Sequence, residues 1–171
     1  DGAPGRYKTL TSMQGERAIL DFSTSEAKSA GFILGGSHWI IENVDIRNTP
    51  GDVKGFQIAG NNNIIRDVRT YTCGDTGLQI SGVSTEPRQK WPQYNQIIRC
   101  LSHDNQDPAS NNADGFAANL TVGDGNLFKD CIAHHNIDDG WDLYTKIETG
   151  PIGLVLIENC VSYMNGFRSD G

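Results

Sequence analysis

The sequence predicts an all-β solenoid, in which short strands wind around one axis and successive turns of the chain stack on each other. Three observations predict it: an internal repeat, an alternation of apolar and polar residues with a period of two, and asparagines at fixed offsets within the repeat. Together they are typical of a right-handed parallel β-helix with asparagine ladders, of which about five coils are present.

The repeat places apolar residues in one column at intervals of 24 to 32 residues. The aligned segments are IIENVDIRNT (40–49), IIRDVRTYTC (64–73), QIIRCLSHDN (96–105), FKDCIAHHN (128–136) and IENCVSYMN (157–165), and the column is Val44, Val68, Cys100, Cys131 and Cys160. A second element, a glycine followed by a large apolar residue, precedes each segment at Gly31-Phe32, Gly55-Phe56, Gly77-Leu78, Gly115-Phe116 and Gly140-Trp141. We therefore expect two short strands per repeat.

The alternation assigns the two faces of the strand that contains the column. Residues of the column and those two positions later are small or apolar and should point inward. The outward positions are Arg47, Tyr71, His103, His134 and Tyr163.

Two sets of asparagines recur at one position of successive repeats. Asn105, Asn136 and Asn165 follow the column at one offset, with Cys73 in the same slot one coil earlier, and Asn63, Asn95 and Asn126 precede it. Asparagine tolerates the left-handed backbone region, and stacked amides can bond from coil to coil, so both sets predict ladders. The segment 84–93 interrupts the repeat and is expected to be a loop insertion.

Composition is that of one folded domain, with 37% hydrophobic and 20% charged residues among 171. The net charge of −7 argues against nucleic-acid binding, which depends on clustered lysine and arginine. No apolar run approaches the ~18 residues of a membrane span, so no membrane partner is expected.

We expect a monomer, and a single β-helix segment over 1–171 that is truncated at both ends, because each end would leave strand edges unpaired.

The four cysteines permit two interpretations. Cys100, Cys131 and Cys160 share an inward column with valines, which favours free thiols packed as small apolar groups. A disulfide remains the alternative, because the count is even. A zinc site is excluded for Cys131 and His134, since residues an odd number of positions apart on a strand face opposite sides.

A cluster of acids stands in NIDDGWDLY (136–144). Asp138 and Asp139 should lie in a turn and Asp142 should point outward, while Asp114 in Asp114-Gly115-Phe116 matches Asp139 one coil earlier. Four crowded carboxylates raise one another's pKa values unless a cation intervenes. Calcium takes six to eight oxygen ligands, so Asp114, Asp138, Asp139 and Asp142 are predicted to bind Ca²⁺. Spacing excludes an EF-hand, and ordinary solvated turn aspartates are the alternative.

The stretches NADGFAANLTVGDGN (112–126) and NIDDGWDLYTKIETGPIG (136–153) resemble the calcium-binding region of polysaccharide lyase family 9, the pectate and related uronate lyases. The resemblance implies a right-handed β-helix and assigns the primary calcium to the same four aspartates. It also implies a secreted, extracellular or periplasmic enzyme that cleaves polygalacturonate, an acidic polysaccharide, by β-elimination. The family's catalytic lysine is expected beyond Gly171, and Asn119 stands where many members have lysine.

Two other functions stay open at this stage. Paired aspartates could serve a metal-independent polysaccharide hydrolase as general acid and base. A general acid needs a raised pKa, however, and these acids are expected in an open polar turn, which does not raise the pKa. A noncatalytic glycan-binding or adhesion segment is the second alternative, because the lysine is missing from this segment. Lys146 is the lysine nearest the acids, and its ordinary interpretation is a solvated residue at the end of a strand.

Overall fold

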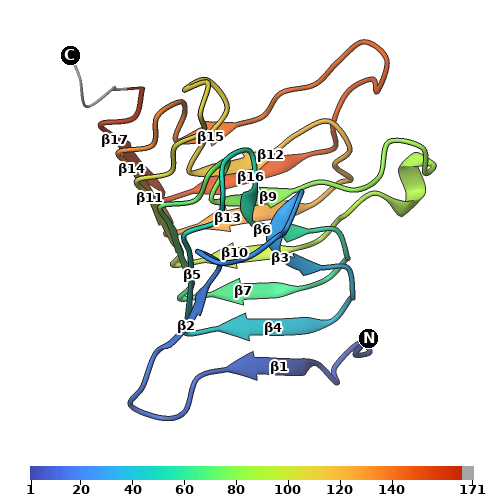
Figure 1. The fold of residues 1–171 in the computed structure, drawn as a ribbon. Helices are drawn as coiled ribbons and strands as arrows, with labels where there is room; N and C mark the ends of the chain where they lie inside the picture. Colours follow the sequence, from blue (N-terminus) through green and yellow to red (C-terminus); the bar gives the residue numbers. More distant parts are fainter. Residues whose placement is uncertain (167–171) are drawn as a thin grey trace.

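The structure is a computed structural model that describes residues 1–166, and it is a parallel β-helix built from three sheets (Figure 1). Each coil contributes one strand to each sheet, so every strand pairs with the strand three places later in the chain. The pairings between these strands are parallel throughout. The predicted fold class is confirmed, and sheets of six, six and five strands are consistent with the expected number of about five coils.

The strands are assigned to the sheets as follows. The first sheet contains β1 (Lys8–Thr11), β4 (Trp39–Glu42), β7 (Ile64–Arg66), β10 (Gln96–Ile98), β13 (Asn126–Lys129) and β16 (Val155–Glu158). The second contains β2 (Ala18–Asp21), β5 (Val44–Arg47), β8 (Arg69–Tyr71), β11 (Leu101–His103), β14 (Ile132–His134) and β17 (Val161–Tyr163). The third contains β3 (Ala30–Leu34), β6 (Lys54–Ile58), β9 (Leu78–Ile80), β12 (Phe116–Ala118) and β15 (Trp141–Asp142).

A coil therefore has three strands, and the prediction of two per repeat was wrong. The segment that was expected to form one strand bends by a single residue with positive φ, which separates the first sheet from the second. These bend residues are Asn43, Asp67, Arg99, Asp130 and Asn159, with φ between 51° and 56°. One left-handed residue turns the chain without interrupting the run of strand-forming residues around it, so the sequence carries little signal of the bend.

The interior of the β-helix is formed by the predicted inward residues. Val44, Val68, Cys100 and Cys131 are each at most 2% exposed. In the third sheet Phe56, Leu78, Phe116 and Trp141 lie in register and form a second inward column, with the rings of Phe116 and Trp141 stacked at 4.9 Å. Burial of these columns against the neighbouring coils is the main source of stability in such a solenoid.

All four cysteines are free thiols, as the inward column favoured. Burial raises the pKa of the Cys73 thiol to about 11, which keeps it protonated and unreactive. Cys160 is only partly buried, because its coil is the last one described and no later strand in residues 1–166 covers it.

Both asparagine ladders are present. The Asn105 and Asn136 side chains donate to the Oδ1 atoms of Asn136 and Asn165 at 2.8 and 2.9 Å, and Asn95 donates to Asn126 at 3.0 Å. The left-handed conformation belongs to the residue before each ladder position, such as Asp104 and His135, and not to the ladder asparagine as we had expected. The ladder position itself needs the amide because its oxygen accepts the backbone N–H of the coil before it in sequence.

Segment 84–93 joins β9 to β10 and projects from the side of the stack (Figure 1). It contains the short 3-10 helix η1 (Arg88–Lys90), which is the one helical element among the described residues. Trp91 anchors the end of this segment, with its indole N–H donating to the Glu86 carbonyl at 3.1 Å. Within residues 1–166 no helix has the length and apolar character of a membrane span.

Candidate functional site

A cleft of about 430 Å³ lies on the outer face of the third sheet and the turns that lead into its strands. Its lining is dominated by carboxylates, side-chain amides and hydroxyls, with one lysine. The lining residues are Lys54, Asp75, Thr76, Gln79, Asn111, Asn112, Asp114, Asn119, Leu120, Asp138, Asp139, Asp142 and Tyr144. The four aspartates predicted from the sequence are all among them.

The glycine of each repeat fixes where these acids stand. At Gly115 a Cβ would lie 2.7 Å from the Ala133 Cβ and 2.8 Å from the Asn136 side chain, so the backbone approaches the second sheet too closely for any other residue. The backbone N–H of Gly115 donates to the Asp139 carbonyl at 2.9 Å. Asp114 and Asp139 therefore occupy the same position on adjacent coils.

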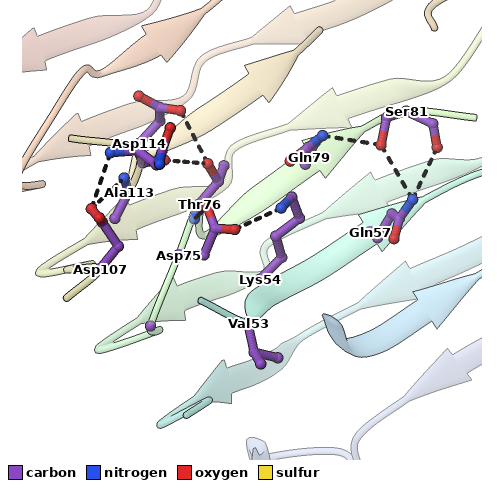
Figure 2. A network of polar contacts seen from close by, with 12 residues as sticks. Val53, Lys54, Gln57, Asp75, Thr76, Gln79, Ser81, Asp107, Ala113 and Asp114 are labelled. Atoms are coloured by element: carbon purple, nitrogen blue, oxygen red, sulfur yellow. Dashed lines mark hydrogen bonds and ion pairs between the residues drawn. The ribbon is translucent and has the colours of Figure 1, made fainter. Parts of the chain in front are cut away.

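Asp114 is the most buried acid of the cleft, at 3% exposed. Its Oδ1 accepts the backbone N–H of Asp139 at 3.1 Å, and its Oδ2 accepts the Thr76 hydroxyl at 3.0 Å (Figure 2). The pKa of Asp114 is raised to about 7, first by burial and then by the nearby charges of Asp142 and Asp138, while these two hydrogen bonds act in the opposite direction.

Asp138 and Asp139 form the turn before β15. Asp139 is exposed and Asp138 is half-buried. Burial raises the pKa of Asp138, and the charges of Asp139, Asp107 and Asp142 act in the same direction. The raised pKa values of Asp114 and Asp138 thus come first from burial and in addition from the like charges around them.

Asp142 points outward from β15, as predicted, and is held by a chain of amides. The Asn119 side chain donates to Asp142 Oδ2 at 2.8 Å, and Gln79 donates to Asn119 Oδ1 at 2.7 Å. In register, Ala117 lies between Gln79 and Asp142 on the outer face of the sheet. Because alanine is small, it leaves the space that Asn119 bridges.

Asp107 organises the loop that precedes Asp114, and its role was missed from the sequence. Its carboxylate is 1% exposed and accepts the backbone N–H groups of Asn111, Asn112 and Ala113 at 3.0, 3.0 and 3.1 Å. Burial raises the pKa of Asp107, but these backbone hydrogen bonds outweigh it and leave the pKa below its usual value. The Asp-Pro pair followed by Asn-Asn was the available signal, since these residues favour a turn closed by the aspartate.

Lys54 and Asp75 were also missed. They form an ion pair across the cleft floor, with Nζ and Oδ2 2.6 Å apart (Figure 2). Lys54 precedes Gly55 as Asp114 precedes Gly115, so the repeat alignment itself could have identified its position on the cleft.

The cleft brings the four predicted aspartates onto one surface, but it does not yet bring their carboxylates to one point. Among residues 1–166 no three acidic, histidine or cysteine side chains are close enough together to share a metal ion. The contacts above give the reason, because the Asp114 and Asp142 carboxylates are turned toward hydrogen-bond donors. The four side chains offer only negatively charged oxygen atoms as metal ligands, which suits a hard divalent cation such as calcium.

The catalytic lysine expected beyond Gly171 lies outside the described residues. Lys146 lines a separate cavity of about 340 Å³ that shares Gln79 and Leu120 with the cleft. Lys146 therefore lies beside the cleft and is not among its lining residues.

Known proteins resemble this chain over its whole length. The family described as the Pel9A-like, right-handed β-helix region matches residues 1–171. The chain belongs to this family. The match also confirms the right-handed sense of the predicted coil.

Two relatives are both named pectate lyase L, from Thermoclostridium stercorarium at 51% identity and from Paenibacillus polymyxa at 46%. Each alignment covers 100% of this chain but only 14% and 38% of the two relatives, so the chain spans less than half of either protein. The crystal structure of pectate lyase Pel9A superposes with a TM-score of 0.81 at 26% identity, over 98% of this chain and 40% of Pel9A.

Proposed function

We propose that this chain is the metal-binding part of a calcium-dependent pectate lyase that cleaves polygalacturonate by β-elimination. The observation that carries the proposal is the gathering of Asp114, Asp138, Asp139 and Asp142, from two successive coils, onto one polar cleft. The names of the relatives supply the reaction class, and the acidic substrate suits a site that combines carboxylates with a cation.

The four aspartates would hold the calcium. A bound calcium ion would neutralise the uronate carboxylate of the substrate and so make the adjacent C5 proton more acidic. Asp139 is exposed and Asp138 and Asp142 are half-buried, while the buried Asp114 would bind the metal after exchanging one of its present hydrogen bonds for it.

The remaining residues of the cleft position these ligands. Asn119 and Gln79 fix the orientation of Asp142, and Asp107 holds the loop that delivers Asp114. The neutral amides of Gln79 and Asn119 add hydrogen-bonding capacity without charge, which suits the hydroxyl groups of a sugar. The C5 proton must pass to a base while the C4 oxygen departs, and we assign no described residue to that role.

A metal-independent hydrolase is the second candidate, and one observation favours it. Contrary to the expectation of an open polar turn, Asp114 is buried and its pKa is about 7, which is the value of a general acid. However, both of its oxygens are engaged and the side chain is 3% exposed, so a glycosidic oxygen has no direct access to it. This geometry favours the lyase.

The test is to incubate the full-length protein containing these residues with polygalacturonate, with calcium or with chelator. A lyase releases unsaturated products that absorb ultraviolet light, and only with calcium. New reducing ends without absorbance would establish the hydrolase, and calcium-dependent binding without any product would establish a noncatalytic glycan-binding segment.

Because the polymer is a large extracellular material, we also propose that the protein acts outside the cell.

Substitution of Asp139 provides the residue-level test. Asp139→Asn should weaken the apparent affinity for calcium at least ~10-fold, since an exposed ligand is lost. Asp52→Asn is the matched control, because Asp52 is likewise an exposed turn aspartate but lies away from the cleft lining. Equal calcium dependence in both variants would contradict the proposed metal site.

A further inference from the structure

We propose that Lys54 is a substrate-binding residue, which captures a carboxylate of a second uronate in the chain whose first uronate lies at the aspartates. The inference rests on the proposed function and extends it, because it assigns a binding subsite to a residue outside the predicted metal site. It also predicts which chemical feature of the polymer this subsite recognises.

Lys54 belongs to the same outer row as the aspartates. The backbone N–H groups of Gly55, Gly77 and Gly115 donate to the carbonyls of Thr76, Asp114 and Asp139 at 3.0, 2.9 and 2.9 Å. These bonds place the residue before each glycine in one line along the axis of the β-helix. In order along this line, the residues are Lys54, Thr76, Asp114 and Asp139. Lys54 is therefore two coils from Asp114, or about 10 Å at the usual strand spacing.

The ammonium group has donors to spare. A lysine ammonium has three N–H donors. The single side-chain hydrogen bond of Lys54 among the described residues goes to Asp75 Oδ2, at 2.6 Å. Asp75 is itself fixed, because its Oδ1 accepts the backbone N–H of Thr76 at 2.6 Å. The ion pair thus holds Nζ at the cleft while leaving two donors for a ligand, and Figure 2 shows the lysine directed toward Asp75 along the cleft floor.

Charge makes Lys54 the natural contact for a polyanion. Among the described residues that line the cleft it is the one cation, whereas five aspartates line the same surface. A polymer with a carboxylate on every sugar would be repelled by these acids wherever no cation intervenes. Calcium serves that purpose at one end of the row, and Lys54 is placed to serve it at the other.

The space between the two ends suits sugar hydroxyls. Thr76 and Gln79 lie between Lys54 and the aspartates, and both present neutral polar groups to the cleft. Gln79 donates to the Ser81 hydroxyl at 3.1 Å, and Gln57 donates to the same hydroxyl at 3.2 Å (Figure 2). Because the amide hydrogens of Gln79 and the hydroxyl hydrogen of Thr76 are already donated, their oxygens remain as acceptors for sugar hydroxyls. A uronate chain running along the axis of the β-helix would thus meet the Lys54 cation, these neutral acceptors and the proposed metal in succession.

A purely structural ion pair is the competing interpretation of Lys54 and Asp75. The side chains of the pair are 26% and 13% exposed, so removing Lys54 leaves the largely buried Asp75 carboxylate without its partner and lowers stability under either interpretation. The two interpretations therefore differ in their effect on binding, which Lys54→Arg separates from folding because it keeps the positive charge. Lys129, which pairs with Glu158 at 3.6 Å on the outer face of the first sheet, offers a matched control far from the cleft lining.

The experiment compares Lys54→Ala, Lys54→Arg and Lys129→Ala with the wild type, in the full-length protein with saturating calcium. Affinity electrophoresis in polygalacturonate and in a methyl-esterified pectin measures binding without turnover, and product absorbance gives KM and kcat. Lys54→Ala should raise KM and the dissociation constant for polygalacturonate about tenfold, the effect of losing one charge-assisted hydrogen bond. Lys54→Arg should restore much of the loss, and Lys129→Ala should match the wild type.

Esterification separates carboxylate recognition from a general loss of binding. The ester removes the charge that Lys54 recognises, so the preference of the protein for the unesterified polymer should shrink in Lys54→Ala. Normal binding and normal preference in Lys54→Ala would overturn the proposal while leaving the lyase function intact. If the wild type releases no unsaturated product, the proposed function fails by itself, and the binding data still decide the role of Lys54.

Discussion

The outer faces of the second and third sheets are built by the same repeat, yet they treat polar groups differently. On the second sheet the outward residues stack on each other, with ring centroids 5.1, 4.9 and 5.0 Å apart along Tyr71, His103, His134 and Tyr163. Arg47 ends this row at Tyr71 and is paired with Asp21 at 2.9 Å. On the third sheet the outward row ends in carboxylates.

The pKa values express the same contrast. Hydrogen bonds from Ser23 lower the pKa of Asp21 to about 2, and Arg47 and Asn48 act in the same direction. Burial and neighbouring carboxylates instead raise the pKa of Asp114 to about 7. Charged groups on the second sheet are therefore paired with neighbouring residues, whereas the third sheet keeps an excess of negative charge that an external cation can neutralise.

The largest expected effect is the removal of calcium. Chelation should reduce lyase activity of the full-length protein at least ~100-fold, because a metal that stabilises transition-state charge contributes several kcal/mol. Product absorbance measures the loss, and added calcium should restore it. Full activity in excess chelator would show that the excess negative charge of the third sheet has no catalytic role.

The next largest expected effect is the loss of stability when a ladder asparagine is replaced, because the ladder holds together the coils that carry both outer faces. Asn136 is fully buried, donates to Asn165 and accepts from Asn105 at 2.8 Å. Asn136→Ala should lower the free energy of unfolding by about 2–4 kcal/mol, because buried partners lose their hydrogen bonds. Urea denaturation measures it. Gln106→Ala is the control, since this neighbouring amide is exposed, and an equal effect in both variants would argue against the ladder.

A pH titration distinguishes the two faces directly. The folded pKa of Asp114, about 7, lies above the ordinary value of an aspartate carboxyl in an unfolded chain, so its contribution favours folding at low pH and is lost as pH rises through 7. In chelator, wild-type stability should therefore fall between pH 4 and 7 relative to Asp114→Asn. The opposite shift of Asp21 predicts stability that is lost only as pH falls toward 2. Urea denaturation across this range measures both, and parallel curves for wild type and Asp114→Asn would contradict the raised pKa.

The smallest expected effect is on the stacked row. His134→Ala should cost about 1 kcal/mol of stability through two lost ring contacts, without changing polygalacturonate binding. Thermal unfolding and affinity electrophoresis together test this. Weaker binding in this variant would mean that the second sheet also faces substrate, and the contrast between the faces would have to be abandoned.

Periodicity was enough to predict the parts of the molecule that repeat. The inward column of Val44 and Cys100, the ladder at Asn105 and the shared surface of Asp114 and Asp139 all follow from spacing, because each coil packs only on its neighbours and a residue's place in the repeat fixes its place in space. Interactions in such a fold are local along the axis, so a sequence alignment is already a partial map of contacts.

The tertiary structure decided what the spacing does not encode. A single left-handed residue such as Asp67 divides one apparent strand into two, and loops of unequal length set where Asp107 and Asn119 meet the acids. The repeat could have placed Lys54 on the cleft, but its ion pair became visible only when the coils were stacked, because its partner Asp75 lies on the next coil. The orientation of each carboxylate depends on such neighbours, since hydrogen bonds between side chains of different coils fix rotamers that no repeat pattern specifies.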